Sequence, residues 1–104
     1  MNKVSLTASV VQLQSLRYTP AGVPAINLVL EHESELIELD TPRIVKVQLK
    51  AIAFGALAET MSRQPLESSG VFHGFLANAR NGKGVTLHIQ EFSKLQGEAQ
   101  NGCT

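Results

Sequence analysis

Apolar residues in this chain recur at every second position over most of its length, and at every third or fourth position once, near the middle. A period of two is typical of half-buried β-strands, and a period between three and four is typical of an amphipathic helix. The alternating segments are residues 3–13, 24–32, 43–53, 71–77 and 85–92. The helical period covers residues 53–61, where Phe54, Leu57, Ala58 and Met61 share one face.

This order of elements constrains the fold. With 104 residues, the chain is long enough for one domain with one core. Five strands with one short helix between the third and the fourth is the element order of the OB fold. We therefore predict an all-β, five-stranded OB-fold barrel over residues 1–95 and a disordered C-terminal tail over residues 96–104. A five-stranded sandwich is the alternative architecture.

Glycine and proline mark the bends between these segments. Pro20 and Gly22 predict a tight turn after the first strand, because proline presets φ and glycine takes a positive φ without strain. Asn81-Gly82 predicts a hairpin between the last two strands, and Gly74 predicts a bend within the fourth. After Val10, a β-bulge is expected to switch the buried face of the first strand.

Charge and cysteine content exclude several classes of protein. The nine basic and nine acidic side chains give a net charge of zero, which argues against a protein that binds polyanions through a large net positive charge. No apolar run approaches membrane-spanning length, and the single cysteine, Cys103, excludes an internal disulfide. His32, His73 and His88 fall on different predicted strands without the spacing of a zinc site. We expect a cytosolic protein with no metal, cofactor or catalytic residues.

Several motifs, taken in order, resemble those of a known family. The segments Asn2-Lys3-Val4-Ser5-Leu6, Arg17–Gly22 and Phe54-Gly55-Ala56-Leu57-Ala58-Glu59 resemble bacterial single-stranded DNA-binding proteins. The chain resembles more closely their shorter relative, primosomal replication protein N, the PriB family. The motifs that carry this second resemblance are Thr19–Pro24, Leu30–Ser34, Gly74-Phe75-Leu76, Asn81-Gly82 and Leu87-His88. Together the motifs cover about residues 2–95.

The resemblance implies a homodimer of OB folds that acts in replication restart. Such a protein binds single-stranded DNA and the restart helicase, and helps to bring in the loading factors that reload the replicative helicase. Cations are needed to follow the phosphates, and the family binds DNA through the middle strands and adjoining loops. The candidate phosphate contacts are Arg17, Arg43, Lys46, Lys50, Arg80 and Lys83. An ordinary solvated strand face is the alternative interpretation of these cations.

Aromatic side chains for base stacking are few, because the chain has no tryptophan. Tyr18 is the best candidate, since it lies in a predicted loop and its phenol tolerates water. Packing over the mouth of the barrel is an equally good interpretation of Tyr18. The helical spacing of Phe54 predicts a core position. Phe72 and Phe75 are expected on opposite faces of a regular strand, unless a bend at Gly74 changes this.

Acidic residues concentrate in one short segment. Five of the nine lie within ten residues, at Glu31, Glu33, Glu35, Glu38 and Asp40. We predict a polar loop over residues 33–42, for which a solvated surface is the simplest explanation. The functional alternative is contact with a basic protein surface through Glu35, Glu38 and Asp40. Carboxylates beside a DNA groove repel phosphate, so we expect weak and steeply salt-dependent DNA binding.

Three functions remain open at this point. The leading hypothesis is a non-catalytic, dimeric OB-fold accessory factor of replication restart that binds single-stranded DNA and a helicase. A DNA-independent protein-interaction module on the same fold is favoured by the neutral charge and the few aromatic residues. A small nuclease would need a carboxylate cluster that holds a metal ion.

Overall fold

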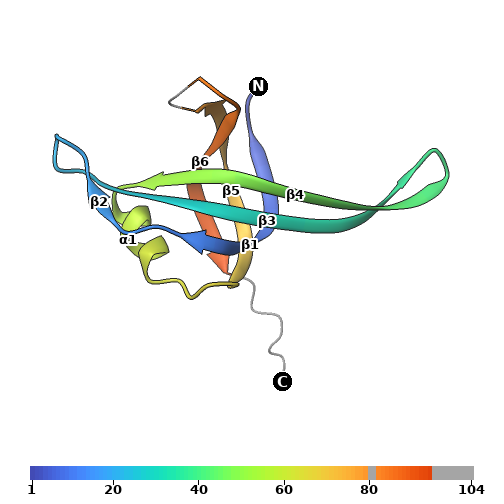
Figure 1. Ribbon diagram of the computed structural model, residues 1–104, viewed down its shortest axis with the longest axis horizontal. Helices are drawn as coiled ribbons and strands as arrows, with labels where there is room; N and C mark the ends of the chain where they lie inside the picture. Colours follow the sequence, from blue (N-terminus) through green and yellow to red (C-terminus); the bar gives the residue numbers. More distant parts are fainter. Residues whose placement is uncertain (80–81, 95–104) are drawn as a thin grey trace.

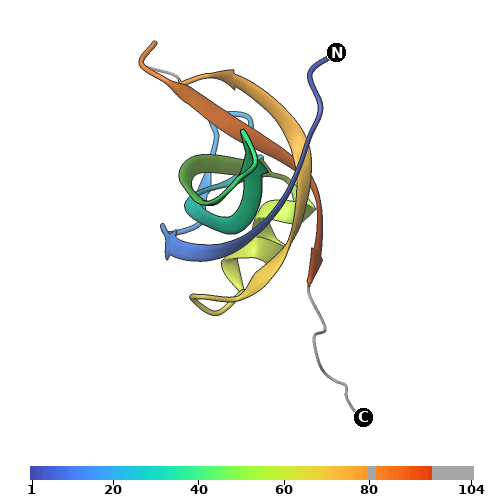
Figure 2. The same cartoon turned by 90° about the vertical axis from the view of Figure 1, so that its right-hand side faces the viewer.

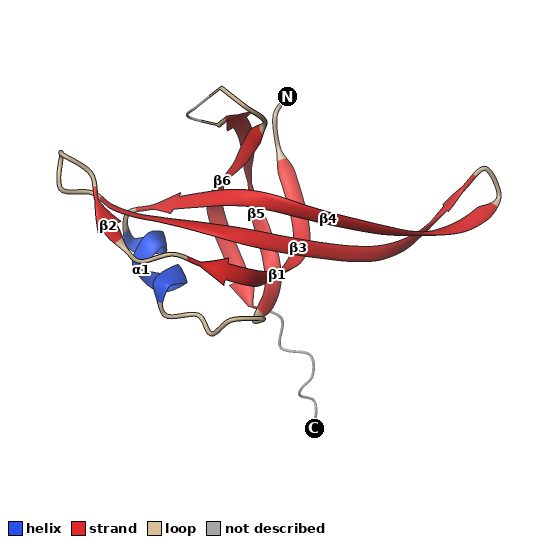
Figure 3. Cartoon of the chain, viewed as in Figure 1, coloured by secondary structure: helices blue, strands red, loops and turns tan. Residues whose placement is uncertain are grey.

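The computed structural model, which describes residues 1–79 and 82–94, consists of a β-barrel, one short helix and a long projecting hairpin (Figure 1). Figure 3 distinguishes the strands, the helix and the connecting loops by colour. In chain order the elements are β1 (Val4–Leu13), β2 (Arg17–Tyr18), β3 (Pro24–Glu38), β4 (Thr41–Phe54), α1 (Ala56–Ser62), β5 (Ser69–Asn78) and β6 (Val85–Lys94).

Strand pairing closes the barrel. The strands follow the order β1-β5-β6-β4-β3-β2, and β1 also pairs with β3, so that the five long strands form a ring. The β4–β6 pair is parallel, and the other pairs are antiparallel. This confirms the predicted five-stranded OB-fold barrel with a helix after the third long strand, and it rules out the sandwich. The two-residue strand β2 is an element that the sequence pattern did not indicate.

The core consists of the inward-facing residues of the alternating strands. Val10, Ile26, Leu30, Phe72 and Leu87 are each 0% exposed. The helix α1 packs against β3 and β4 and buries Ala58 and Met61, two of the residues on the predicted helical face. Burial of these apolar side chains is the main favourable contribution to folding.

Phe54 does not belong to this core, contrary to the prediction. It is the last residue of β4, and its side chain is 44% exposed. The chain turns at Gly55, which has φ = 72°, and the helix begins only at Ala56. The helical spacing therefore does not apply to Phe54, and the alternation of the strand decides where its ring points.

The bulges and turns lie where the sequence predicts them. The β1–β3 register shifts between Val10 and Gln12, and that of β5–β6 shifts at Gly74. Phe72 is buried and Phe75 half-buried, on opposite faces of β5. In the first turn Gly22 has φ = 84°, and its N–H donates to the Thr19 carbonyl at 2.8 Å. Asn81 and the predicted tail, residues 96–104, lie outside the described residues.

The predicted polar loop over residues 33–42 is wrong. β3 continues to Glu38 and β4 begins at Thr41, with an unbroken register from Ala25↔Phe54 to Glu38↔Thr41. The turn consists of Leu39 and Asp40, with φ of 50° and 62°. Positive φ at both central residues is typical of the type I′ turn, whose twist matches that of the strands. The resulting hairpin extends well beyond the barrel (Figure 1), and Figure 2 shows it from its tip.

His32 fixes the point at which this hairpin leaves the barrel. Its Nδ1 lies 2.7 Å from the Thr7 carbonyl oxygen, and its Nε2 lies 2.9 Å from the Ser34 hydroxyl. A carbonyl only accepts hydrogen bonds, so Nδ1 donates to it, and Nε2 pairs with the Ser34 hydroxyl. The side chain thus ties β3 to β1 just beyond the Ser9↔Glu31 pair of the ladder.

Replacing Gly74 with alanine should destabilise the barrel. An added Cβ would lie 1.9 Å from the His88 carbonyl oxygen, a backbone atom that cannot move aside alone. Overpacking of this kind costs about 1–3 kcal/mol, which chemical denaturation measures as a lower free energy of unfolding. Gly22→Asn is the control, because nothing lies within 4 Å of a Cβ added there and asparagine tolerates a positive φ. Equal stability of Gly74→Ala and the wild type would contradict this packing.

Candidate nucleic-acid interface

The strand β4 presents its even-numbered residues on the outer face of the barrel. Ala51 and Ala53 are buried, whereas Lys50 and Phe54 are exposed and Ile52 is half-buried. Lys46 lies on the same face as Lys50, because the ladder with β3 has no irregularity between them. The prediction that these two lysines share one surface is therefore confirmed.

A row of side chains crosses four strands on this outer face. The ladder pairs Asn27 on β3 with Ile52 on β4, Ile52 with His88 on β6, and His88 with Phe75 on β5. All four residues are half-buried. Residues paired across neighbouring strands lie on the same face and touch, so the row forms one continuous surface.

Three rings gather at one end of this row. The His88 and Phe75 rings are stacked, with their centroids 4.9 Å apart and an interplanar angle of 15°. The Phe54 ring lies 6.2 Å from the His88 ring, tilted by 33°. Flat rings that are partly open to solvent are the side chains on which unpaired bases stack. We refer to Phe54, Phe75 and His88 as the ring cluster.

A groove runs from the ring cluster toward Lys50. At one end it is lined by Arg17, Asn27, Phe54 and His88, among others. The adjoining hollow shares Asn27 and Thr86 with this end and extends to Lys50. We call these two joined hollows the outer groove.

Arg17 is held in place at the ring end of the outer groove. Its Nη2 and Nε donate to Asn27 Oδ1 at 2.8 and 3.3 Å. A guanidinium carries five N–H donors, so three remain for a phosphate or a base edge. The outer groove therefore combines a positioned cation, a lysine and stacking surfaces, which are the components of a single-strand binding site.

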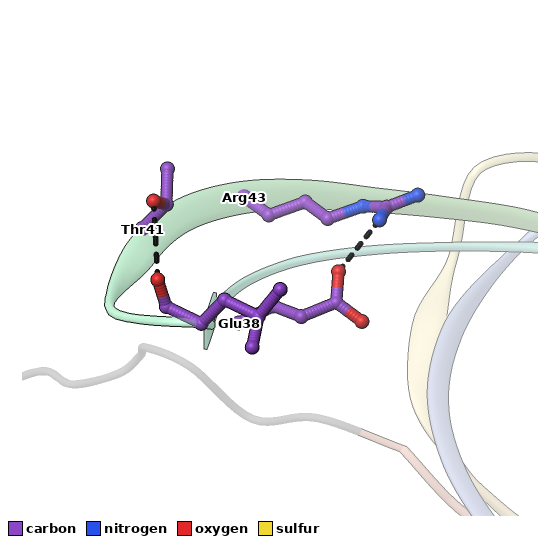
Figure 4. A network of polar contacts seen from close by, with 4 residues as sticks. Glu38, Thr41 and Arg43 are labelled. Carbon is purple, nitrogen blue, oxygen red and sulfur yellow. Dashed lines mark hydrogen bonds and ion pairs between the residues drawn. The ribbon is translucent and has the colours of Figure 1, made fainter.

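The other predicted DNA contacts are spread more widely. Tyr18, 61% exposed, pairs with Pro24 in the ladder and is not among the residues that line the outer groove. Lys83 is exposed in the connection between β5 and β6. Arg43 lies on the opposite face of β4 from Lys50, and its Nη1 is 2.6 Å from Glu38 Oε1 (Figure 4). Arg80 lies outside the described residues.

Carboxylates continue the outer face beyond Lys50. Glu31, Glu33 and Glu35 alternate along β3 on the same face as the lysines. Gln48 Nε2 donates to Glu31 Oε2 at 3.3 Å, and Glu33 faces Lys46 across the ladder. The outer face thus changes from cations and rings at the barrel to carboxylates along the hairpin.

The sequence reasoning missed the ring cluster. The sequence does contain a signal for the exposure of Phe54. Strand alternation that starts from Lys46 and Lys50 places Ile52 and Phe54 on the same outer face. The approach of Phe75 and His88 to Phe54 follows from the parallel β4–β6 pairing, which no local pattern encodes.

Within residues 1–79 and 82–94, no three His, Cys, Asp or Glu side chains group as metal ligands. No helix in those residues is long and apolar enough to cross a membrane.

Comparison with known proteins places this fold in a family. The model of a single-strand binding protein family matches residues 2–91. The replication restart protein PriB of Bordetella pertussis is 41% identical over 98 residues, which cover 93% of this chain and 92% of that protein. PriB of Vibrio cholerae is 32% identical, with 90% and 98% covered.

Solved structures agree with the sequence relatives. That of PriB from Ralstonia solanacearum superposes with a TM-score of 0.80 at 32% identity, covering 90% of this chain and 97% of that one. The single-stranded DNA binding protein of Thermus aquaticus, 24% identical with a TM-score of 0.71, shares the fold. The resemblance found in the sequence is thereby confirmed: the chain belongs to the PriB family of replication restart proteins and carries the OB fold of single-strand binding proteins.

Proposed function

We propose that this protein is a non-catalytic accessory factor of replication restart that binds single-stranded DNA in the outer groove. The observation that carries the proposal is that Arg17, Phe54 and His88 line one of the two joined hollows of the outer groove and Lys50 lines the other. Phe75 stacks on His88 at the ring end. Cations there follow the phosphates while the rings stack on bases. The kinship with PriB proteins supports the biological setting, a cytoplasmic restart complex.

The same proposal includes the partners of the restart reaction. Bound to DNA, the protein contacts the restart helicase and helps to bring in the loading factors that reload the replicative helicase. Glu35, Glu38 and Asp40 are the candidate partner-binding residues, since all three are exposed on the hairpin or its turn. DNA binding is weak, because Glu31, Glu33 and Glu35 lie on the face that the DNA approaches.

Binding to labelled oligo-dT should be saturable at low salt and should fall steeply with ionic strength. Arg17, Lys46, Lys50 and Lys83 are the four proposed phosphate contacts among the described residues. Each contact releases about 0.7 counterions, so the logarithm of the binding constant should fall with the logarithm of the salt concentration with a slope of about −3. This slope corresponds to about fifty-fold weaker binding at about 200 mM salt than at about 50 mM. Fluorescence anisotropy titrations at several salt concentrations measure this slope.

A matched pair of variants separates the outer groove from the rest of the surface. Lys50→Gln should weaken binding and reduce the salt slope by about 0.7. Arg43→Gln, on the opposite face of the same strand, should leave both unchanged. Equal effects of the two variants would contradict the groove, as would a sub-nanomolar dissociation constant at physiological salt. No saturable binding even at low salt would favour the DNA-independent interaction module.

Removing one ring should weaken binding without changing its salt dependence. Stacking contributes about 1–3 kcal/mol per base, so Phe54→Ala should raise the dissociation constant about tenfold. Phe54→Tyr keeps the ring and should restore most of the affinity. Leu66→Ala changes a residue of similar exposure away from the groove and should have no effect. An unchanged affinity of Phe54→Ala would exclude stacking on this ring.

The proposal also includes a homodimer, with the first half of β1 as the contact. Val4–Ala8 pairs with β5 along one edge, whereas the pairing of β1 with β3 begins only at Ser9. The second edge of this half is therefore open for a strand from another copy, apart from the Thr7 carbonyl that His32 occupies. Sedimentation at micromolar concentration should give a mass of 22.4 kDa, twice the 11.2 kDa of the chain. A species of 11.2 kDa alone would contradict the dimer.

A further inference from the structure

The neutral net charge of the chain hides a separation of charge between the hairpin and the barrel. We call residues 31–47 the hairpin arm. It carries five of the nine acidic and two of the nine basic side chains, a net charge of −3. The rest of the chain has four acidic and seven basic side chains, a net charge of +3. Three of the four proposed phosphate contacts, Arg17, Lys50 and Lys83, thus lie on the basic part, and Lys46 lies at the base of the acidic arm, opposite Glu33.

The end of the hairpin arm is also unusually apolar. Leu36, Ile37, Leu39 and Ile44 are 55%, 68%, 93% and 61% exposed. We call these four residues the tip patch. Single exposed apolar residues are ordinary on protein surfaces, but a group of them at the end of a projection indicates a contact surface. Ile37 and Ile44 lie diagonally across the ladder on the outer face, and Leu36 lies on the other face.

Leu39 adds an independent argument for contact. It has φ = 50° in a type I′ turn, a position where asparagine or glycine is at lower energy than leucine. Its side chain is 93% exposed, so packing within the described chain does not offset this strain. Strained, exposed residues gather at functional surfaces, and a leucine here suits a partner that buries it.

The carboxylates around the tip patch are only partly neutralised. Glu33 faces Lys46 in the ladder, and Glu38 forms an ion pair with Arg43. Glu35 faces Ile44 instead of a cation, and Asp40 lies in the turn beside Leu39. The apolar surface is therefore bordered by negative charge along β3 and at the turn.

We propose that the tip patch and its acidic border dock a basic segment of another protein that carries apolar side chains. Complementary charge guides such a partner to the arm, and burial of the leucines and isoleucines supplies the affinity. DNA is excluded as the occupant because the carboxylates repel phosphate. Arm against arm would bring two charges of −3 together, which disfavours that pairing of copies. A reciprocal contact of each arm with the other copy's barrel is the competing occupant, and the sedimentation measurement below distinguishes it. The inference refines the partner contact of the proposed function and does not depend on DNA binding.

Two substitutions test the arm without disturbing the fold. Leu39→Asn removes the side chain and places a residue that favours the turn, so stability should be kept or raised. Ile37→Thr removes apolar surface, and threonine, like isoleucine, is β-branched and therefore suits a strand position. Leu66→Asn is the matched control, because this leucine is 60% exposed elsewhere on the molecule.

The probe is a labelled peptide of alternating lysine and leucine, compared with the same peptide with glutamate in place of lysine. In anisotropy titrations of the full chain, the lysine peptide should bind saturably and the glutamate peptide should not. The double variant Ile37→Thr/Leu39→Asn should bind the lysine peptide at least tenfold more weakly, and Leu66→Asn should bind it like the wild type. Oligo-dT binding should be the same in the wild type, the double variant and Leu66→Asn.

Results at the peptide, in the double variant or in sedimentation would overturn the proposal. Lack of saturable binding of the lysine peptide, or equal binding by the double variant, would exclude the tip patch as its site. Loss of oligo-dT binding in the double variant would assign the tip to DNA. Sedimentation that shows assemblies lost only in the double variant would make a second copy the occupant. Failure of the wild type to bind oligo-dT, with peptide binding intact, would overturn the proposed DNA function alone.

Discussion

The unbroken ladder between β3 and β4 is the constraint on which the outer groove and the hairpin arm both depend. Because side chains alternate along a strand, a slip of one residue would exchange the two faces of the sheet. Lys50, Ile52 and Phe54 would then point into the barrel, and Ala51 and Ala53 would point out. Burial prevents such a slip, since it would place the Lys50 ammonium in the core and expose Ala51 and Ala53, which are 1% and 0% exposed. The packing of the core thus determines which residues meet a ligand.

The same ladder reconciles the proposed binding of a polyanion with a net charge of zero. Near the barrel, the outer face carries Lys50 and the ring cluster, with Arg17 held beside them by Asn27. Further out, the face carries glutamates. Charge at a distance is screened within about 8 Å at physiological ionic strength, so the glutamates weaken the proposed DNA binding without cancelling the nearer cations. Placement along one long hairpin therefore matters more than the sum of charges.

The sequence predicted the barrel well because its strands are half-buried and alternate clearly. The bulge after Val10, the turn at Gly22 and the bend at Gly74 also lie where residue types demand them. The errors have physical reasons. Alternating glutamates in residues 33–38 resemble a solvated loop, although a two-stranded hairpin with both faces in water tolerates the same residues. The prediction places Phe54 on the helix because apolar residues occur both at the end of the strand and at the start of the helix, so the periodicity does not mark the boundary between them. The ring cluster depends on the parallel β4–β6 contact, which is tertiary information.

The central claim is that single-stranded DNA lies across the row that joins β3, β4, β6 and β5. Titration of the isotope-labelled full chain with oligo-dT at low salt, followed by NMR, tests this most directly. The account predicts the largest chemical-shift changes at Asn27, Ile52 and His88. The chemical shifts of the Phe54 and Phe75 ring protons should also change, and those of the tip patch should stay the same. Changes confined to the hairpin arm, or to the opposite face of β4 around Arg43, would contradict it.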